Sequence, residues 1–503
     1  MVTRGLWNLR VDGKWYRSFH PPRGRIASPD TPATLDRIRK ILSETNLAAW
    51  ECVPFPSPLH IDLDYVYNID KDLGLLTVVQ WTGDEGVLSR MRREATLTRL
   101  ANPSLHTIEA ALEVVGDEFD QENDEASPPT SETLTINMRN PTPLNELQLL
   151  FLTDFIFLWK FYLDDMSSWR NTSLLFRTLA IGILRIAAWD FEVRIDTDTT
   201  DIPLTFSSVP SWKAPSTDIF WFHGFLITLH GTTDEVGEAI SKAQAFLNET
   251  PRRGQVTQVI LMSLSHIRLV EISSECVRCS SAIPIIVNTS AMYPSPGCRV
   301  LSSVLSSYAW KDFSSHGESW RVNLPSEIFD MVLETVLPRD LVTFAQASLE
   351  VEKWYYSSVP QLDGLAVRGF NLSIPCCGKR DRPDTEGISC STCYTWYHAM
   401  CVGLGPEACS RTYVCSDCEQ HRRCDMMEMG GIYDVYRKHR SRPSCKVTID
   451  GLDKTLQLRT SKPARRRPEL WLYGRDSVPA GEIKYSVFFG GMFSGLAYGF
   501  EGE

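Results

Sequence analysis

The sequence predicts a multi-domain α+β protein with an α/β-like N-terminal half, a short helical segment, a cysteine-rich segment and a small C-terminal β-sheet. Three observations indicate this. The chain has 503 residues, of which 43% are hydrophobic, enough for about three domains of roughly 100 to 200 residues each. Strand-like and helix-like apolar runs alternate through the first 310 residues. Finally, nine of the 14 cysteines lie between Cys376 and Cys424.

Residues 1–115 predict a small α+β domain. The runs IDLDYVYNI and LGLLTVVQW are rich in β-forming residues and flank Asp70-Lys71-Asp72, which indicates a β-hairpin. The following stretch is acidic, contains Pro128-Pro129 and has few apolar residues. Such a composition buries too little surface to become ordered, so we expect a flexible acidic linker over 116–143.

Residues 144–310 predict an α/β or α+β domain with buried helices. The runs LNELQLLFLTDFIFLWKFYL and SLLFRTLAIGILRIAAW are apolar on most faces, as is typical of helices enclosed by a core. WFHGFLITLHG predicts a strand, and QVTQVILMSL with HIRLVEI predicts a strand pair. Between them, Thr232-x-x-Glu235 forms a capping box that predicts a helix ending near Asn248.

Residues 320–360 predict two or three short helices. Two apolar stripes recur at helical spacing on either side of Pro338-Arg339-Asp340. The first contains Ile328, Met331, Val332 and Val336, and the second contains Leu341, Phe344, Ala347 and Val351. Taken alone, this pattern fits any helical hairpin in a core.

Residues 370–422 predict a zinc-binding segment. Its ligand pairs are Cys390-x2-Cys393, His398-x2-Cys401 and Cys415-x2-Cys418, preceded by the adjacent Cys376 and Cys377. Zinc prefers four nitrogen or sulfur ligands in a tetrahedron, and a Cys-x2-Cys turn offers two thiolates from one tight knuckle. We therefore expect one Zn²⁺ ion, and a second if Cys376 and Cys377 contribute.

This ligand order resembles the PHD finger, as do Trp396-Tyr397-His398 and Cys401-Val402-Gly403. The resemblance implies interleaved sites, with Cys390, Cys393, Cys415 and Cys418 on one zinc and His398, Cys401 and the first cysteine pair on the other. PHD fingers have Cys-x-Cys or Cys-x2-Cys at the first pair, whereas this chain has adjacent cysteines. The first site is thus expected to be distorted, to recruit Cys424 or His421, or to be lost.

Many PHD fingers bind a histone tail by holding a methylated lysine in an aromatic cage through cation-π contact. By this resemblance, Trp396 is a candidate peptide-binding residue. The loop before Cys390 lacks an aromatic residue for the opposite wall, and Gly387 stands where a larger apolar residue is common. The favoured interpretation is therefore that Trp396 packs against the metal knuckles.

The helical segment resembles the F-box motif through Leu324-Pro325-x-Glu327-Ile328, Asp340-Leu341, Ala347-Ser348 and Trp354. The resemblance implies docking onto a Skp-type adaptor protein, which would make the chain a substrate receptor of a cullin-RING ubiquitin ligase. Its adaptor-contacting residues would be Leu324, Pro325, Ile328, Val332 and Leu341. A degenerate motif kept only as a structural hairpin is the alternative.

The chain as a whole resembles uncharacterised F-box proteins of basidiomycete fungi. The resemblance lies in Thr3-Arg4-Gly5, the F-box-like segment, Cys376-Cys377-Gly378-Lys379 and the ending FFGGMFSGLAYG. It implies no known activity.

Residues 423–503 predict a basic segment followed by a β-rich domain. The runs CKVTID, TLQLRT, ELWLY and EIKYSVFF are separated by turn signals, which indicates a small sheet. The net charge of the chain is −11, yet residues 419–468 hold 13 Lys and Arg against 6 Asp and Glu. Such a segment could contact nucleic-acid phosphates, although charge runs are usually solvated loops.

Other sequence features argue against several classes of protein. There is no Gly-x-Ser-x-Gly nucleophile elbow, and Val2 excludes an N-terminal nucleophile hydrolase with its nucleophile at residue 2. Cys276-x2-Cys279 lacks a second knuckle and is interpreted as structural, despite Cys298 and His266 nearby in sequence. The longest apolar runs are broken by charges, and no signal peptide is evident.

We therefore expect a cytoplasmic or nuclear, non-enzymatic protein with no membrane contact. The leading hypothesis is an F-box-type adaptor that recognises an unknown protein substrate. The alternative is a chromatin or nucleic-acid interaction module that uses the finger and the basic segment to bind a histone tail or nucleic acid.

Overall fold

The protein is described from a computed structural model, which has a mixed α+β architecture with several β-sheets. The described residues are 5–19, 32–44, 46–59, 63–82, 89–101, 111–114, 132–134, 138, 141, 143–163, 173–195, 209–231, 236–249, 256–273, 276–286, 294–306, 310, 325–336, 340, 344, 351, 366–369, 376–377, 387–404, 412–421, 445–449, 451–459 and 483–501.

The N-terminal part forms a seven-stranded sheet in the order β3-β2-β1-β4-β5-β6-β7. The predicted hairpin is confirmed, because β4 and β5 pair antiparallel around the turn at Lys71. Helix α1 packs Ile38 and Ile41 into the same buried cluster as Trp7 and Tyr67. The bounds are β1 Gly5–Val11, β2 Lys14–Phe19, α1 Pro32–Ser43, β3 Glu51–Val53, β4 Tyr65–Asp70, β5 Leu75–Thr82, β6 Ser89–Thr96, α2 Leu97–Ala101 and β7 Glu113–Val114.

The loop after β3 joins this sheet to the helical layer. The Asn8 amide nitrogen donates to the Ser57 carbonyl at 2.8 Å, and the Ser57 backbone N–H donates to Asn8 Oδ1 at 3.0 Å. Beside them, the ring of Phe55 meets that of Tyr162 edge-on, with centroids 5.7 Å apart. The hydrogen bonds between Asn8 and Ser57 thus fix the loop to the sheet, while Phe55 of the same loop packs against the helical layer.

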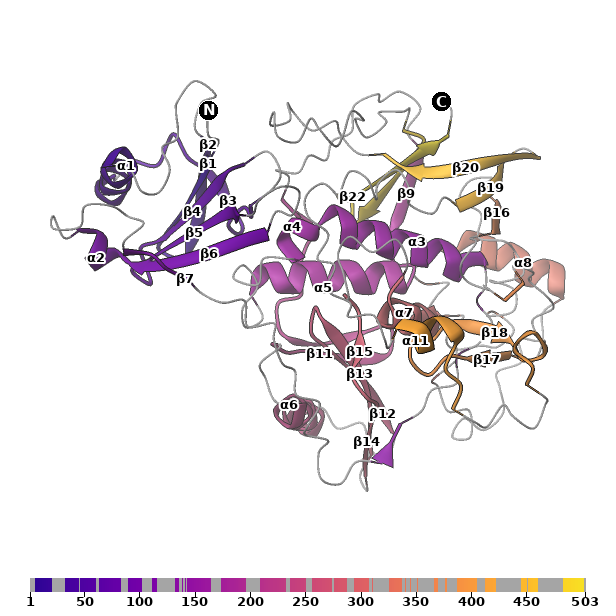
Figure 1. The fold of residues 1–503 in the computed structure, drawn as a ribbon. Helices are drawn as coiled ribbons and strands as arrows, with labels where there is room; N and C mark the ends of the chain where they lie inside the picture. Colours follow the sequence, from indigo (N-terminus) through magenta and orange to yellow (C-terminus); the bar gives the residue numbers. More distant parts are fainter. Residues whose placement is uncertain are drawn as a thin grey trace.

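Two apolar helices form the central layer, as the sequence predicts. They are α3 (Pro143–Leu158), which continues as α4 (Lys160–Leu163), and α5 (Leu174–Ala187). The hydroxyl of Ser173 caps α5 by accepting from the Phe176 N–H. Figure 1 shows α3 and α5 side by side, with a sheet on each side of the pair. Because both faces of these helices are covered, they are apolar around most of their circumference.

The sheet on one side runs β10-β11-β12-β13-β14-β8, with β15 pairing with β13. The predicted pair β12–β13 is confirmed as antiparallel. WFHGFLITLHG, predicted as one strand, is instead the hairpin β10–β11, because His223 and Gly224 take positive φ angles of 47° and 86° and reverse the chain. The bounds are β10 Ile219–Phe222, β11 Phe225–Leu229, α6 Val236–Glu249, β12 Thr257–Met262, β13 His266–Ile272, β14 Val277–Cys279, β15 Ile283–Pro284 and α7 Pro296–Ser306.

Part of the predicted linker also belongs to this sheet. Strand β8 (Glu132–Thr133) pairs parallel with β14, and the Leu134 N–H donates to the Cys279 carbonyl at 3.0 Å. The prediction of a flexible linker is therefore wrong for 132–134, because the edge of β14 supplies backbone partners to a segment poor in apolar residues. Residues 115–131 lie outside the described part, as do Thr232 and Glu235 of the predicted capping box.

The sheet on the other side runs β16-β19-β20-β22-β21-β9. It includes β9 and β16, which lie outside the predicted C-terminal range of 423–503, because the edges of β21 and β19 pair with these distant segments. ELWLY lies outside the described residues. The bounds are β9 Glu192–Ile195, β16 Ala366–Gly369, β19 Cys445–Ile449, β20 Leu452–Leu458, β21 Tyr485–Phe489 and β22 Met492–Phe500.

One hydrophobic core joins the helical layer to both of these sheets. It contains Ile227 and Leu269 from one sheet, Val487 and Tyr498 from the other, and Phe155 between them. Buried hydrogen bonds fix the contact of α3 with β22, since the Tyr498 hydroxyl donates to Asp154 Oδ2 at 3.0 Å. The C-terminal sheet is therefore packed against the helices of the N-terminal half.

Candidate metal centres of the cysteine-rich segment

The cysteine-rich segment is built on a short hairpin. Strands β17 (Gly387–Ser389) and β18 (Trp396–His398) pair antiparallel, followed by the 3₁₀ turn η4 (Met400–Val402) and helix α11 (Ser416–His421). The turn between the strands carries the knuckle Cys390-x2-Cys393. The chain reverses after η4 at Gly403, whose φ is 73°. These tight turns bring ligand residues that are far apart in sequence together into two groups.

The eight predicted ligands gather into two groups of four. One group contains Cys390, Cys393, Cys415 and Cys418, and the other contains Cys376, Cys377, His398 and Cys401. Within each group, all ligand atoms lie within 4.8 Å of one another. We call the first the all-cysteine cluster and the second the histidine cluster. The grouping is the interleaved one that the PHD resemblance implies.

In the all-cysteine cluster, backbone N–H groups point at the sulfur atoms. Cys390 Sγ accepts from the N–H groups of Thr392 and Cys415, each at 3.4 Å. Cys415 Sγ accepts from the Cys418 N–H at 3.4 Å. Such donors stabilise the thiolate, which is the form that binds metal. The knuckle backbone is thus arranged to support negative charge on its sulfurs.

Hydrogen bonding also separates the pKa values of neighbouring thiols in this cluster. The hydrogen bond from Cys393 is the main reason that the pKa of Cys390 is lowered to about 4, against the opposing effect of burial. The same bond raises the pKa of Cys393. Burial and the neighbouring Cys415 raise the pKa of Cys418 to about 12. Without metal, Cys390 is therefore the thiol that ionises most readily, while Cys393 and Cys418 keep their protons.

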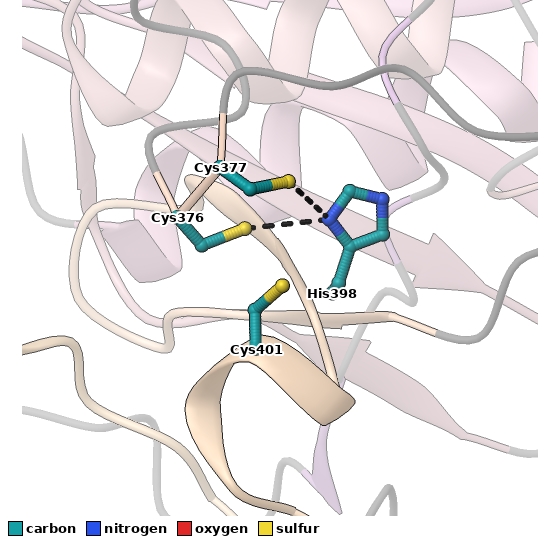
Figure 2. A group of neighbouring side chains, drawn as sticks. All are labelled: Cys376, Cys377, His398 and Cys401. Atoms are coloured by element: carbon teal, nitrogen blue, oxygen red, sulfur yellow. Dashed lines mark hydrogen bonds between the residues drawn. The ribbon is translucent and has the colours of Figure 1, made fainter.

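The histidine cluster forms around the imidazole of His398, which is 3% exposed. Figure 2 shows Cys376 and Cys377 side by side, with dashed lines from both sulfur atoms to His398 Nδ1. Each of these two distances is 3.4 Å. Cys401 reaches the same point from η4. The sulfur atoms of both adjacent cysteines therefore lie beside His398 Nδ1. The sequence alone leaves open whether two adjacent cysteines can share one metal site.

The distances in both clusters fit zinc. Tetrahedral zinc with Zn–S bonds of about 2.3 Å and Zn–N bonds of about 2.0 Å separates two sulfurs by roughly 3.8 Å and a sulfur from a nitrogen by roughly 3.5 Å. Cys393 Sγ and Cys415 Sγ lie 3.8 Å apart, and the sulfur–nitrogen distances around His398 are 3.4 Å. Each cluster could thus hold one metal ion, and its donors are compatible with zinc. The side chains of Cys424 and His421 lie outside the described part.

Trp396 is a packing residue in this structure. Its side chain is 5% exposed, and its ring meets the His398 imidazole edge-on with centroids 4.8 Å apart. Gly387 also lies close to this ring, since a Cβ there would clash with Trp396 Cζ2. A cage wall needs an exposed aromatic face, so Trp396 as found does not present a methyl-lysine site.

The segment also contacts the central domain, which the sequence did not indicate. Tyr394 packs against the main core, and its hydroxyl hydrogen-bonds Ser281. Burial lowers the pKa of Arg299 in α7, and the nearby sulfurs of Cys393 and Cys415 oppose this effect when they are ionised. A tetrathiolate zinc site carries a net charge of about −2, so a neighbouring guanidinium stabilises it. No local sequence signal identifies Arg299, because the contact depends on tertiary packing.

The predicted adaptor-contacting residues lie at helix α8 (Ser326–Thr335) as far as the structure describes them. Pro325 is exposed immediately before the helix, while Ile328 and Val332 are 49% and 48% exposed on it. Leu324 and Leu341 lie outside the described residues. The two central residues of the predicted contact set thus share one accessible helix face.

The other cysteine pair does not form a metal cluster among the described side chains. Cys276 is exposed and Cys279 is buried, with the Cys279 thiol donating to the Ser280 carbonyl at 3.3 Å. Cys298 is fully buried in α7, and burial raises the pKa of its thiol to about 11. The described part of this region agrees with the interpretation of structural cysteines.

None of the described helices combines the length and apolar character that crossing a bilayer requires. Comparisons with known proteins gave no relatives, since no family model, no curated protein and no solved structure matches the chain. Function must therefore be inferred from this chain's own residues.

Proposed function

We propose that this protein is an F-box-type substrate-recognition adaptor of a cullin-RING ubiquitin ligase. The observation that carries the proposal is an accessible apolar stripe on helix α8. In this proposal, the helix docks on a Skp-type adaptor, and other surfaces of the chain bind the protein substrate. The likeness to basidiomycete F-box proteins belongs to the same proposal.

Helix α8 carries two apolar stripes that face different ways. Phe329, Leu333 and Val336 follow the spacing i, i+4, i+7; Leu333 is 3% exposed, and the other two pack against the main core. Ile328, Met331 and Val332 follow the spacing i, i+3, i+4, and they are 49%, 65% and 48% exposed. The inward stripe packs the helix against the domain. The outward stripe lies on the accessible face of the helix.

The outward stripe argues against a purely structural hairpin. A helix on the surface of a soluble domain normally presents polar residues to solvent, and apolar residues grouped on one exposed face are typical of binding sites. Docking of such a face into a partner's groove is a common mode of helix recognition. Phe344, further along the same segment, is also 52% exposed.

In this proposal the cysteine-rich segment is a PHD-like module with zinc in both clusters and a structural role. The contacts of Tyr394 and Arg299 support this role, because they attach the module to the central domain next to the all-cysteine cluster. The burial of Trp396 favours it over histone-tail binding.

Binding of the purified chain to a fungal Skp-type adaptor tests the proposal. We expect a stable complex with the wild-type chain. The double substitution Ile328→Glu and Val332→Glu should weaken it at least about thirtyfold, as expected for interface anchors worth about 2 kcal/mol or more. Leu73→Glu is the matched control, because Leu73 is 70% exposed in the turn between β4 and β5, and its complex should be unchanged.

Thermal unfolding of each variant separates lost binding from lost folding. Since Ile328 and Val332 are about half exposed, their replacement should leave the melting temperature almost unchanged. If the wild-type chain fails to bind the adaptor, or if the double variant binds as well as the control, the proposal is wrong.

A further inference from the structure

The two metal clusters differ in how far the protein encloses their sulfur atoms. In the all-cysteine cluster, Cys390 and Cys415 are 0% and 1% exposed. In the histidine cluster, Cys377 and Cys401 are both exposed, and Cys376 is partly so. Only the imidazole of the histidine cluster is well buried. Two cysteines of the histidine cluster are thus accessible to small reagents, whereas the all-cysteine cluster has two enclosed cysteines and two, Cys393 and Cys418, that are partly exposed.

Backbone hydrogen bonds add to the enclosure of the all-cysteine cluster. Three backbone N–H groups donate to sulfurs of the all-cysteine cluster. The hydrogen bonds shown in Figure 2 for the histidine cluster join its own members, Cys376 and Cys377 with His398. N–H donors withdraw electron density from a thiolate and orient it, so they make a metal site more resistant to attack. Burial and hydrogen bonding therefore both protect Cys390 and Cys415.

We infer that the histidine cluster is an oxidation site for hydroperoxides, at which Cys377 and Cys401 form a disulfide and the zinc ion is released, while the all-cysteine cluster keeps its ion. This inference rests on zinc in both clusters, which the proposed function includes, and not on docking of α8. It assigns to the adjacent cysteines a role that a purely structural zinc finger does not require.

Exposure selects Cys377 and Cys401 as the pair, because Cys376 is only partly exposed. Their sulfur atoms lie within 4.8 Å of each other, and both residues are exposed. Cys376 and Cys377 are neighbours, so their Cα atoms are about 3.8 Å apart across a trans peptide, below the usual range of about 4.4 to 6.8 Å for a disulfide. A bond between Cys377 and Cys401 instead joins two separate backbone segments and avoids that strain.

The chemistry proceeds in two balanced steps. The Cys377 thiolate attacks the hydroperoxide, forming an S–O bond as the O–O bond breaks and hydroxide or alkoxide leaves. The Cys401 thiolate then attacks that sulfur, forming the S–S bond as the S–O bond breaks and hydroxide leaves. The two sulfurs give up two electrons and the peroxide oxygens accept them. Cys376 and His398 remain as two donors, too few to retain zinc, and a dithiol reductant reverses the oxidation.

The test uses the wild-type, zinc-loaded full chain with hydrogen peroxide and a chromophoric zinc chelator. We expect two ions per chain at the start, rapid release of one, and retention of the second until a denaturant or thiol-blocking reagent is added. Trypsin then separates the two segments, because Lys379 and Arg380 lie between Cys377 and Cys401. Mass spectrometry should find a cross-link between Cys377 and Cys401, and dithiothreitol should restore zinc binding.

Cys52→Ser is the control for general oxidation, because Cys52 is exposed on β3 and belongs to neither cluster. Its release curve should match that of the wild type. Any one of four results would overturn the inference: a single bound ion at the start, simultaneous release of both ions, earlier loss from the all-cysteine cluster, or a disulfide other than Cys377–Cys401. Adaptor protein is absent from this assay, so its outcome is separate from that of the binding experiment above.

Discussion

Gly387 lies so close to the Trp396 indole that a Cβ on residue 387 would clash with Cζ2 and Cε2 of that ring. Gly387→Ala should therefore displace Trp396 and the adjacent His398. We expect a loss of about 1 to 3 kcal/mol in the stability of the segment, the usual effect of overpacking. Thermal unfolding and zinc content measure it.

Gly237→Ala is the matched control for this substitution. Gly237 lies in α6, and a Cβ there would meet nothing within 4 Å. Alanine is the better helix former by about 1 kcal/mol, so this variant should be as stable as the wild type or more so. Equal stability of the Gly387→Ala variant and the wild type would contradict the close packing of Trp396.

Metal content gives a second prediction. Native mass spectrometry of the reduced protein should find two zinc ions, because Cys376 and Cys377 both face His398. Cys390→Ser should lose one ion and lower the melting temperature, since Cys390 is fully buried in the all-cysteine cluster. Cys276→Ser should keep both ions, because Cys276 belongs to neither cluster. A wild-type chain with one ion would show that the adjacent cysteines do not complete a site.

The hydrogen bond from Tyr498 to Asp154 gives a third prediction. Both side chains are buried, at 0% and 1% exposure. Tyr498→Phe removes one donor from a buried carboxylate and should lower the free energy of unfolding by about 1 to 3 kcal/mol. Denaturant unfolding of this variant, of Asp154→Asn and of the double variant forms a cycle that measures the coupling. A coupling energy near zero would mean that the bond does not stabilise the contact of α3 with β22.

The pair of Arg17 and Glu51 predicts a pH dependence. The hydrogen bond from Arg17 lowers the pKa of Glu51 below its ordinary value of 4.5, against a smaller opposing effect of burial. A lowered folded-state pKa means that the pair stabilises the fold above about pH 4.5 and that this contribution disappears as pH falls through the lower folded-state pKa. Since Glu51 is 57% exposed, we expect an effect within about 1 kcal/mol.

Thermal unfolding of the Glu51→Gln variant and the wild type between about pH 3 and pH 7 checks this. The wild type should be the more stable at neutral pH, and the difference should shrink towards the acid end of the range. Glu113→Gln is the control, because Arg99 and Glu113 are 54% and 72% exposed, and its effect should be smaller. A difference that grows towards low pH would contradict the assignment.

Several elements follow from local sequence because their causes are local. The turn at Lys71 between two β-forming runs is enough to predict the hairpin of β4 and β5. The apolar runs of α3 and α5 predict buried helices. Spacing predicts the knuckles Cys390-x2-Cys393 and Cys415-x2-Cys418, because each pair is held by its own tight turn, whereas their assignment to one zinc ion is what the PHD resemblance implies. Neighbouring residues decide each of these features.

The histidine cluster, by contrast, depends on residues that are distant in sequence. Spacing alone could not decide whether Cys376 and Cys377 share one site, since their position relative to His398 depends on how the segment folds against the hairpin. The same holds for β8 beside β14 and for β9 beside β21, because a strand edge can pair with any segment that packing brings to it.

The hairpin of β4 and β5, the buried helices and the identity of the metal donors can thus be read from the order of the residues alone. Which sulfur atoms are exposed, and which stripe of α8 faces outward, depends on how the chain packs. Helical spacing places Ile328 and Leu333 on different faces of the helix but does not say which face meets the core. That choice depends on the apolar surface of the central domain, to which residues far apart in the chain contribute.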